Sequence, residues 1–141
     1  MRLIDEIIIH CTATSARKKV TIDEIDRWHR DRKMKCIGYH FVIHQDGSIS
    51  EGRPLSDIGA HCKQHNLNSI GIAYVGGLNS DTGKPEDTRT QEQRDSLFFL
   101  IERLVQEYPI QYIVGHNKYA NKACPCFDAE LEYLYLTEHL A

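Results

Sequence analysis

Five stretches of the chain have the apolar pattern of β-strands. Residues 3–10 carry a run of isoleucines, and residues 39–44 combine aromatic with β-branched side chains, as buried strands do. The other three stretches are residues 48–52, 69–76 and 111–116. Asp46 and Gly47 lie between the second and third stretches. They predict a tight hairpin turn, because glycine tolerates the positive φ that such a turn needs.

Three helices are expected between and after these strands. The first two begin at a capping box, in which a threonine hydroxyl is followed three residues later by the side chain of Glu24 or Gln93. Apolar side chains then recur at helical spacing along each helix. The predicted helices extend from Thr21 to near Lys35, from Thr90 to the residue before Pro109, and from Asp128 through Leu140.

The order of these elements predicts the fold class. Strands and helices alternate, with one hairpin, which is typical of an α/β fold: a central mixed β-sheet flanked by about three helices. A chain of 141 residues is long enough to bury a core of its own, so we expect a single domain over residues 1–141. Residues 77–89 are polar, and we expect them to form a loop that rims a cleft.

Composition excludes several classes of partner. The net charge of -3 provides no basic footprint for nucleic acid and argues against an electrostatic grip on an anionic membrane. No apolar stretch is long enough to span a bilayer, and the first six residues carry charges where a signal peptide would need an apolar core. Five cysteines without the spacing of a disulfide scaffold suit synthesis in a reducing cytosol. We expect a monomer.

Three side chains from distant parts of the chain form a candidate metal site. His10 ends the first apolar run, His116 ends the last predicted strand, and Cys124 lies in a short loop held by a proline. If the two strands are adjacent and parallel, both imidazoles emerge at the same edge of the sheet, where α/β folds bind ligands. Two imidazoles and one thiolate make a three-ligand zinc site, which leaves a fourth position for water.

Spacing alone leaves other assignments open. Cys126 competes with Cys124 as the sulfur ligand, and Asp128 is a further candidate, although we favour a helix cap for it. A cysteine hydrolase that uses Cys124 or Cys11 with a histidine as base is a different class of enzyme. A zinc nucleobase deaminase is disfavoured, because Thr12 occupies the position where such enzymes carry a glutamate after the histidine.

An ordered set of short motifs resembles a known family. These motifs lie at residues 8–14, 28–30, 37–43, 59–61, 68–72, 114–116 and 122–125. The set is similar to that of the zinc N-acetylmuramoyl-L-alanine amidases, which include the lysozymes of T-odd phages and the peptidoglycan recognition proteins. It extends over nearly the whole chain and is most similar to the phage-lysozyme branch. The resemblance implies the fold of that family.

The resemblance also implies site residues and a reaction. The metal ligands of the family fall on His10, His116 and Cys124, and its catalytic residues on Tyr39 and Lys122. The implied reaction is hydrolysis of the amide between N-acetylmuramic acid and L-alanine in a peptidoglycan muropeptide, with zinc as cofactor. In this scheme Lys122 stabilises the developing oxyanion, and Tyr39 orients the attacking water or donates to the same oxyanion. Neither Cys126 nor Cys62 has a role in the pattern.

Further expectations concern the substrate and the place of action. His61, His65 and Asn66 lie in a loop beside the predicted sheet edge and are candidates for substrate contacts. Some relatives in this family lack the cysteine ligand and only bind peptidoglycan, and the presence of Cys124 weighs against that alternative. An endolysin-type enzyme without a signal peptide would be made in the cytoplasm and reach the cell wall after release or by another route of export.

Overall fold

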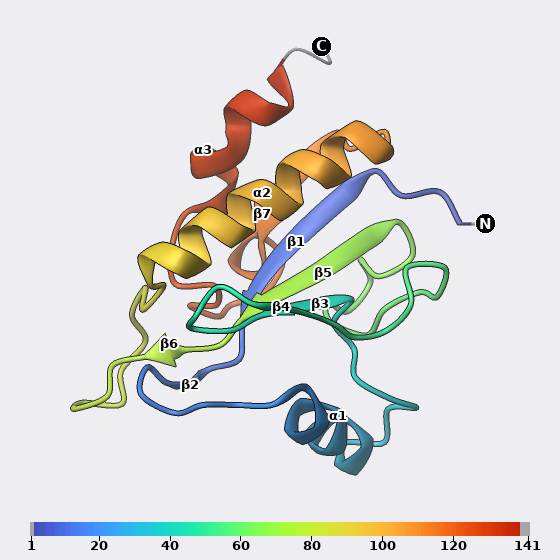
Figure 1. The fold of residues 1–141 in the computed structure, drawn as a ribbon. Helices are drawn as coiled ribbons and strands as arrows, with labels where there is room; N and C mark the ends of the chain where they lie inside the picture. The colour runs from blue at the N-terminus through green and yellow to red at the C-terminus, as the bar shows by residue number, and fades with distance from the viewer. Residues whose placement is uncertain (1, 139–141) are drawn as a thin grey trace.

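A five-stranded mixed β-sheet forms the centre of the molecule. A computed structural model describes residues 2–138 of the chain. The strands lie in the order β4-β3-β5-β1-β7, and three α-helices surround them (Figure 1). The strands of this sheet are β1 (Glu6–Cys11), β3 (Phe41–Ile43), β4 (Ile49–Glu51), β5 (Ser69–Tyr74) and β7 (Tyr112–Gly115). The predicted α/β fold with a mixed sheet is confirmed.

The direction of the strands follows the connections between them. Strand β1 lies between β5 and β7 and is parallel to both, and β3 is parallel to β5. Only β4 is antiparallel, because it returns from β3 through the predicted hairpin, where Gly47 has a φ of 89°. The long connections between parallel strands leave several carboxyl ends at one edge of the sheet, where a site can form.

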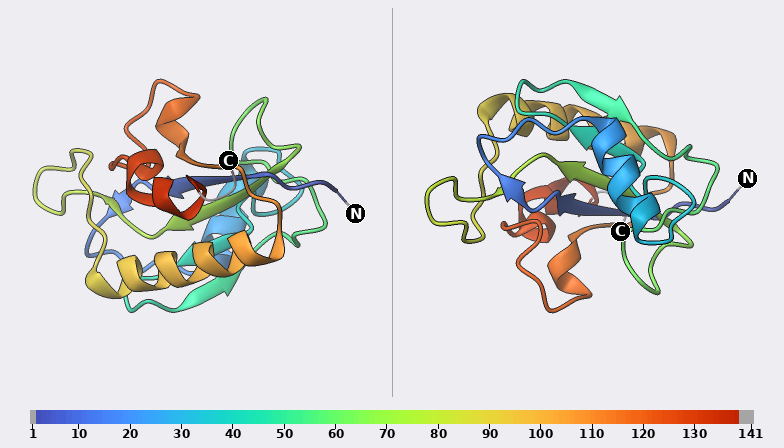
Figure 2. Two further views of the ribbon diagram at one scale, coloured as in Figure 1. Left: turned by 90° about the horizontal axis from the view of Figure 1, so that it is seen from above. Right: turned by 90° about the horizontal axis from the view of Figure 1, so that it is seen from below.

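Helices cover both faces of the sheet. Helices α2 (Gln91–Glu107) and α3 (Ala129–Tyr133) pack on one face, and α1 (Ile22–Asp31) lies on the other (Figures 1 and 2). Alternate residues of β1 point to the two sides: Ile7 and Ile9 join the core under α2, whereas Ile8 packs on the opposite side. His10 follows the alternation of Ile8, so the strand directs its imidazole away from α2.

Local sequence signals set the helix starts as predicted. Both capping boxes are present, with the hydroxyl of Thr21 accepting from the amide of Glu24, and that of Thr90 accepting from the amide of Gln93. Asp128 caps α3 through the amide of Leu131. Caps of this kind satisfy amide groups that have no partner within the helix, so they act independently of the rest of the fold.

The ends of some elements differ from the prediction. Strand β1 starts later than expected and includes Cys11, so His10 is its penultimate residue. Helix α1 ends at Asp31, four residues before the predicted Lys35, since the chain turns at Lys33 with a φ of 71°. Helix α3 ends at Tyr133 and is followed by a 3-10 turn, Leu134–Leu136. The predicted end at Leu140 lies outside the described residues.

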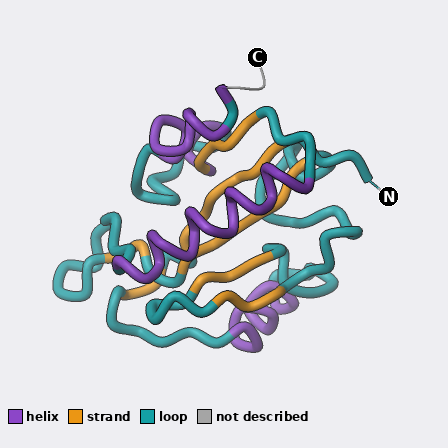
Figure 3. The backbone as a smooth tube through the Cα atoms, turned by 45° about the horizontal axis from the view of Figure 1, so that its top comes forward, coloured by secondary structure: helices purple, strands orange, loops and turns teal. Residues whose placement is uncertain are grey.

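The polar segment 77–89 is not entirely a loop. Its first two residues form β6 (Gly77–Leu78), which pairs in parallel with β2 (Thr14–Ser15) in a separate two-stranded sheet. The local sequence of residues 77–89 did not indicate this backbone pairing with a distant segment, so only the folded chain shows it. Most of the rest of the segment is irregular, as is much of residues 52–68 (Figure 3). Within residues 2–138 no helix has the length and apolarity to cross a membrane.

Candidate metal centre and active site

Strands β1 and β7 bring two histidines together. Ile9 pairs with Gly115 in the parallel register, so the next residues of the two strands, His10 and His116, lie side by side. The centroids of their rings are 4.6 Å apart. His116 begins a 3-10 turn directly after β7, which turns the chain away from the sheet. The adjacency expected for two parallel strands is confirmed.

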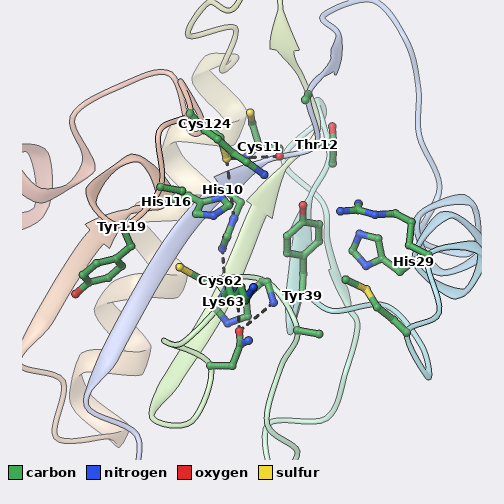
Figure 4. A pocket seen from close by; sticks show the side chains of 18 residues that line it. His10, Cys11, Thr12, His29, Tyr39, Cys62, Lys63, His116, Tyr119 and Cys124 are labelled. Carbon is green, nitrogen blue, oxygen red and sulfur yellow. Dashed lines mark hydrogen bonds between the residues drawn. The ribbon is translucent and has the colours of Figure 1, made fainter.

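The loop before α3 adds a cysteine to this pair. The Sγ atom of Cys124 accepts a hydrogen bond of 3.2 Å from the backbone amide of Cys11 and lies 3.9 Å from Nδ1 of His10. One donor atom from each of His10, His116 and Cys124 can be chosen so that all three lie within 4.8 Å of one another. Figure 4 shows the three side chains converging from β1, from the end of β7 and from the loop. Donor atoms at this separation can share one metal ion.

The rival sulfur and carboxylate point elsewhere. Cys126 donates a weak hydrogen bond of 3.5 Å from its Sγ atom to the carbonyl of Gly77 and is not a member of the three-residue cluster. Cys126 has a φ of 72°, so the chain turns at this residue. Asp128 is engaged as the cap of α3. Tertiary structure therefore separates two cysteines that their spacing could not distinguish.

The protonation states of the cluster suit a cation. Burial lowers the pKa of His10 well below its ordinary value, and the neighbouring His61 and His116 lower it further. Burial, and then the ammonium of Lys122, lowers the pKa of His116. A hydrogen bond from the thiol of Cys11 lowers the pKa of Cys124, against the opposing effect of burial. Neutral imidazoles and an acidified thiol keep their lone pairs available to a metal at neutral pH.

A cavity of about 650 Å³ opens above the cluster. Its lining contains the three donor residues together with Tyr39 and the exposed Lys122, the two predicted catalytic residues. The ring of Tyr39 lies 5.2 Å from that of His10, centroid to centroid. Burial raises the pKa of the Tyr39 hydroxyl, which therefore stays protonated and able to donate at neutral pH.

Tyr39 and His40 take different positions. In the predicted strand over residues 39–44 these neighbours would point to opposite faces, but the strand begins only at Phe41, and Tyr39 lies before it. Tyr39 lines the cavity, whereas His40 is buried below it. The Nδ1 atom of His40 accepts from the amide of Gly71, and its Nε2 atom lies 2.9 Å from the carbonyl of Asp57.

The three candidates for substrate contacts differ in accessibility. His61 lines the cavity but is only 9% exposed, and both of its ring nitrogens have partners within the protein, since Nδ1 lies 2.8 Å from His10 Nε2 and Nε2 lies 3.2 Å from Ser69 Oγ. Asn66 also lines the cavity, and its Oδ1 atom accepts from the amides of His61 and Cys62. His65 is not part of the lining and stacks on Tyr119, with ring centroids 3.6 Å apart.

Several lining residues were not predicted. His29 on the inner face of α1 is buried, accepts from the amide of Gly38 through Nδ1, and lies with its ring 5.2 Å from that of Tyr39 (Figure 4). The sequence feature that could have indicated this position is the place of His29 on the apolar face of the predicted helix. Arg32 and Lys63, like Lys122, add positive charge to the lining, and none of the described residues that line the cavity carries a carboxylate. The cavity is therefore complementary to an anionic ligand.

Comparison with known proteins identifies one family. The family described as N-acetylmuramoyl-L-alanine amidase matches residues 1–127. The endolysin of Escherichia phage T7 is 40% identical over 124 residues, which cover 88% of this chain and 82% of the relative. A peptidoglycan-recognition protein of Drosophila melanogaster is 36% identical over 124 residues, covering 84% of this chain and 66% of that protein.

A solved structure agrees with this assignment. The N-acetylmuramoyl-L-alanine amidase LysC from Clostridium intestinale URNW superposes with a TM-score of 0.80 at 29% sequence identity, over 99% of this chain and 86% of that one. The structure of bumblebee PGRP-SA superposes with a TM-score of 0.76 at 22% identity, over 95% of this chain and 82% of that one. At 22% identity, the comparison with bumblebee PGRP-SA shows a shared fold and nothing further.

Proposed function

The chain belongs to the N-acetylmuramoyl-L-alanine amidase family, and we propose that it is a zinc-dependent lytic amidase of the endolysin type. Its reaction is the hydrolysis of the amide between the lactyl group of N-acetylmuramic acid and L-alanine in peptidoglycan. The relatives that support the reaction are named as endolysins and amidases. The cofactor and the roles of individual residues are the finer part of the proposal.

One observation carries the choice of zinc: the convergence of His10, His116 and Cys124 at the floor of the cavity. The donor set suits the ion, because zinc accepts both imidazole nitrogen and thiolate sulfur, and three protein ligands are typical of its catalytic sites. The amide of Cys11 points at the sulfur, which favours the thiolate that a metal requires.

We assign the chemistry around the cluster to two further side chains. Bound by these ligands, zinc would acidify a water molecule and polarise the scissile carbonyl. Lys122 lies two residues before Cys124, so the loop that carries the sulfur also carries an ammonium to the place where negative charge develops on the carbonyl oxygen. The protonated hydroxyl of Tyr39 orients the attacking water or donates to the same oxygen.

Two other functions are weaker. A cysteine hydrolase would need a histidine base beside its thiol. Nδ1 of His10 lies 3.9 Å from the Cys124 sulfur, but burial lowers the pKa of His10 well below its ordinary value, which makes it a weak base. A module that only binds peptidoglycan would not need a thiol with a lowered pKa beside two neutral histidines.

Digestion of purified peptidoglycan tests the reaction. We expect the protein to release free amino groups of L-alanine, without new reducing sugar ends, because the bond cut is an amide. Dialysis against a chelator should abolish the release, and zinc should restore it. Release of reducing ends would make the protein a glycosidase, and full activity after removal of all metal would contradict the zinc assignment.

The mode of action is also part of this proposal. A monomer made in the cytoplasm, acting on the wall after release or by another export route, fits an endolysin-type enzyme. Sedimentation of the purified protein tests the oligomeric state, since a stable dimer would contradict a monomer. The whole chain acts as one catalytic domain in this proposal.

A further inference from the structure

A second histidine stands directly behind one of the proposed metal ligands. The Nε2 atom of His10 lies 2.8 Å from the Nδ1 atom of His61, and the two rings are perpendicular, with centroids 4.9 Å apart. Both side chains are buried, with 1% and 9% of their surface exposed. The other nitrogen of His10, Nδ1, is the one near the sulfur of Cys124. The two nitrogens of His10 therefore have different neighbours, one in the donor cluster and one in the protein interior.

The hydrogen bonds beyond His61 decide where the protons lie. The hydroxyl of Ser69 is 2.7 Å from the backbone carbonyl of His65, and a carbonyl can only accept, so the hydroxyl proton is used there. The oxygen of Ser69 is then free to accept from Nε2 of His61, which lies 3.2 Å away. A neutral His61 with its proton on Nε2 has a lone pair on Nδ1. That lone pair must accept from Nε2–H of His10.

This chain of donors leaves one tautomer for His10. With the proton of His10 on Nε2, the lone pair of Nδ1 is directed toward the cluster that contains Cys124. The opposite tautomer would place two lone pairs against each other between His10 and His61, and would leave the Nδ1 atom of His10 protonated and unable to bind a metal. The buried network of His61 and Ser69 thus selects the form of His10 that can act as a ligand.

Packing holds the ring of His61 in this place. A Cβ atom at Gly71 would lie 2.5 Å from Cγ of His61, and one at Gly59 would lie 2.7 Å from its Cδ2 atom. Glycine at both positions lets the ring lie against the backbone of β5 at Gly71 and against the loop at Gly59. The side chain of Asn66 accepts from the amides of His61 and Cys62, which fixes the backbone from which the ring extends. The ring is held from two sides and from its own main chain.

We propose that His61 is a positioning residue that holds His10 as the Nε2–H tautomer, with Nδ1 turned toward Cys124. Ser69 and Asn66 support it from behind. The expected consequence, tight zinc binding, rests on the proposed function. The tautomer of His10 does not, because hydrogen bonds within the protein set it without a metal. It replaces the expected role of His61 as a substrate contact, because both ring nitrogens already have partners inside the protein.

Zinc affinity provides the first test. We expect His61→Phe, which keeps a ring but cannot accept from His10, to bind zinc about 10–100-fold more weakly in competition with a chromophoric chelator. His61→Gln offers an amide oxygen as acceptor and should recover most of the affinity. His40→Phe is the matched control, since His40 is also buried and its ring lies 5.9 Å from that of His61. Its ring nitrogens contact Gly71, Asp57 and Arg2, and not a proposed ligand. Wild-type affinity in His61→Phe, or an equal loss in His40→Phe, would overturn the inference.

The second test needs no substitution and decides the matter if a variant fails to fold. Nitrogen-15 spectra of histidine-labelled, metal-free protein report which ring nitrogen carries the proton. We expect the proton of His10 on Nε2. A proton on Nδ1 of His10 would refute the role of His61 even if the enzyme were active. Conversely, a wild-type protein that shows the expected tautomer but binds no zinc would contradict the proposed function and leave the positioning role standing.

Discussion

Gly115 and Pro125 pack so closely that a Cβ atom on the glycine would lie 2.7 Å from Cδ of the proline. Each is the direct neighbour of a proposed ligand, because His116 follows the glycine and Cys124 precedes the proline. Through this contact the loop before α3 packs against the end of β7. It therefore sets the position of the sulfur relative to the imidazole.

Substitution of this glycine should loosen the metal site. In Gly115→Ala the added methyl group must displace Pro125 or the side chain of Asn117, whose Oδ1 atom would lie 2.6 Å away. We expect the free energy of unfolding to fall by about 1–3 kcal/mol, as overpacked sites do, and zinc affinity to fall with it. Urea denaturation and chelator competition measure the two effects. Unchanged zinc affinity would show that the contact does not position the ligands.

The two cysteines of the loop should respond differently to removal. Cys124→Ala is expected to lose stoichiometric zinc and amidase activity, because it removes one of three donors. Cys126→Ala should keep both, since the Cys126 sulfur makes only a weak bond to a backbone carbonyl. Elemental analysis of the purified variants and the peptidoglycan assay give the answer. Zinc retained at full occupancy in Cys124→Ala would refute the ligand assignment.

Lys122 should contribute to turnover without holding the metal. Lys122→Met removes the ammonium from the exposed rim of the cavity, and we expect kcat to fall about 100–1000-fold, the usual cost of one oxyanion donor. Zinc content should be unchanged. Lys63→Met is the matched control, because Lys63 is also an exposed lysine in the lining but lies in a different loop. An equal loss of kcat in both variants would mean that the lysines supply only a general positive field.

The metal-free protein should lose stability as the pH falls below about 6.5. Burial lowers the pKa of His40 to about 4, whereas an unfolded histidine titrates near about 6.5. Between these values the unfolded chain binds a proton that the folded chain does not, so the free energy of unfolding decreases with falling pH, by up to about 3 kcal/mol for this residue. Other buried histidines act in the same direction.

The substitution His40→Gln isolates the contribution of His40 to the pH dependence of the free energy of unfolding. The glutamine oxygen can accept from the amide of Gly71 in place of Nδ1, but it does not titrate. Urea denaturation at several pH values between 7 and 4.5, with a chelator present, should show a shallower decline than in the wild type. A decline as steep as that of the wild type would assign the effect to other groups.

A buried arginine should stabilise the fold outside the site. The side chain of Arg89 is 1% exposed, pairs with Asp87 at 2.9 Å and with Glu132 at 2.8 Å, and stacks on Phe127 at 3.3 Å. Arg89→Met would remove the ion-pair partner of Glu132 and would leave Asp87 paired only with the more exposed Arg94, at 3.1 Å. We expect a loss of about 2–3 kcal/mol, below the cost for a fully buried pair because water reaches both acids.

Arg103 provides the comparison for this ion pair. It pairs with Glu107 at 3.6 Å on the surface of α2, and its side chain is 59% exposed. Arg103→Met should change the free energy of unfolding by less than about 0.5 kcal/mol. Chemical denaturation of both variants measures the difference. Equal effects at the two positions would show that burial does not strengthen the Arg89 cluster.

Sequence predicted best where the cause of structure is local. The two capping boxes, the hairpin at Gly47 and the cap at Asp128 each depend on contacts within a few residues, and all are present. The strand β6 was missed, because its pairing partner lies more than sixty residues earlier in the chain. The end of α1 was placed four residues too late, because the turn that ends it is made by Lys33 rather than by glycine.

The amino-acid sequence by itself determined the α/β fold class and, through ordered motifs that resemble a family, the reaction and the candidate ligands. Only the tertiary structure separated Cys124 from Cys126 by geometry, turned His61 inward behind His10, and brought His29 to the cavity wall. The physical reason is that a donor atom acts through its direction and its distance from partners on other elements. Spacing along one segment gives neither the direction nor the distance, because both are set only when β1, β7 and the loop before α3 pack together.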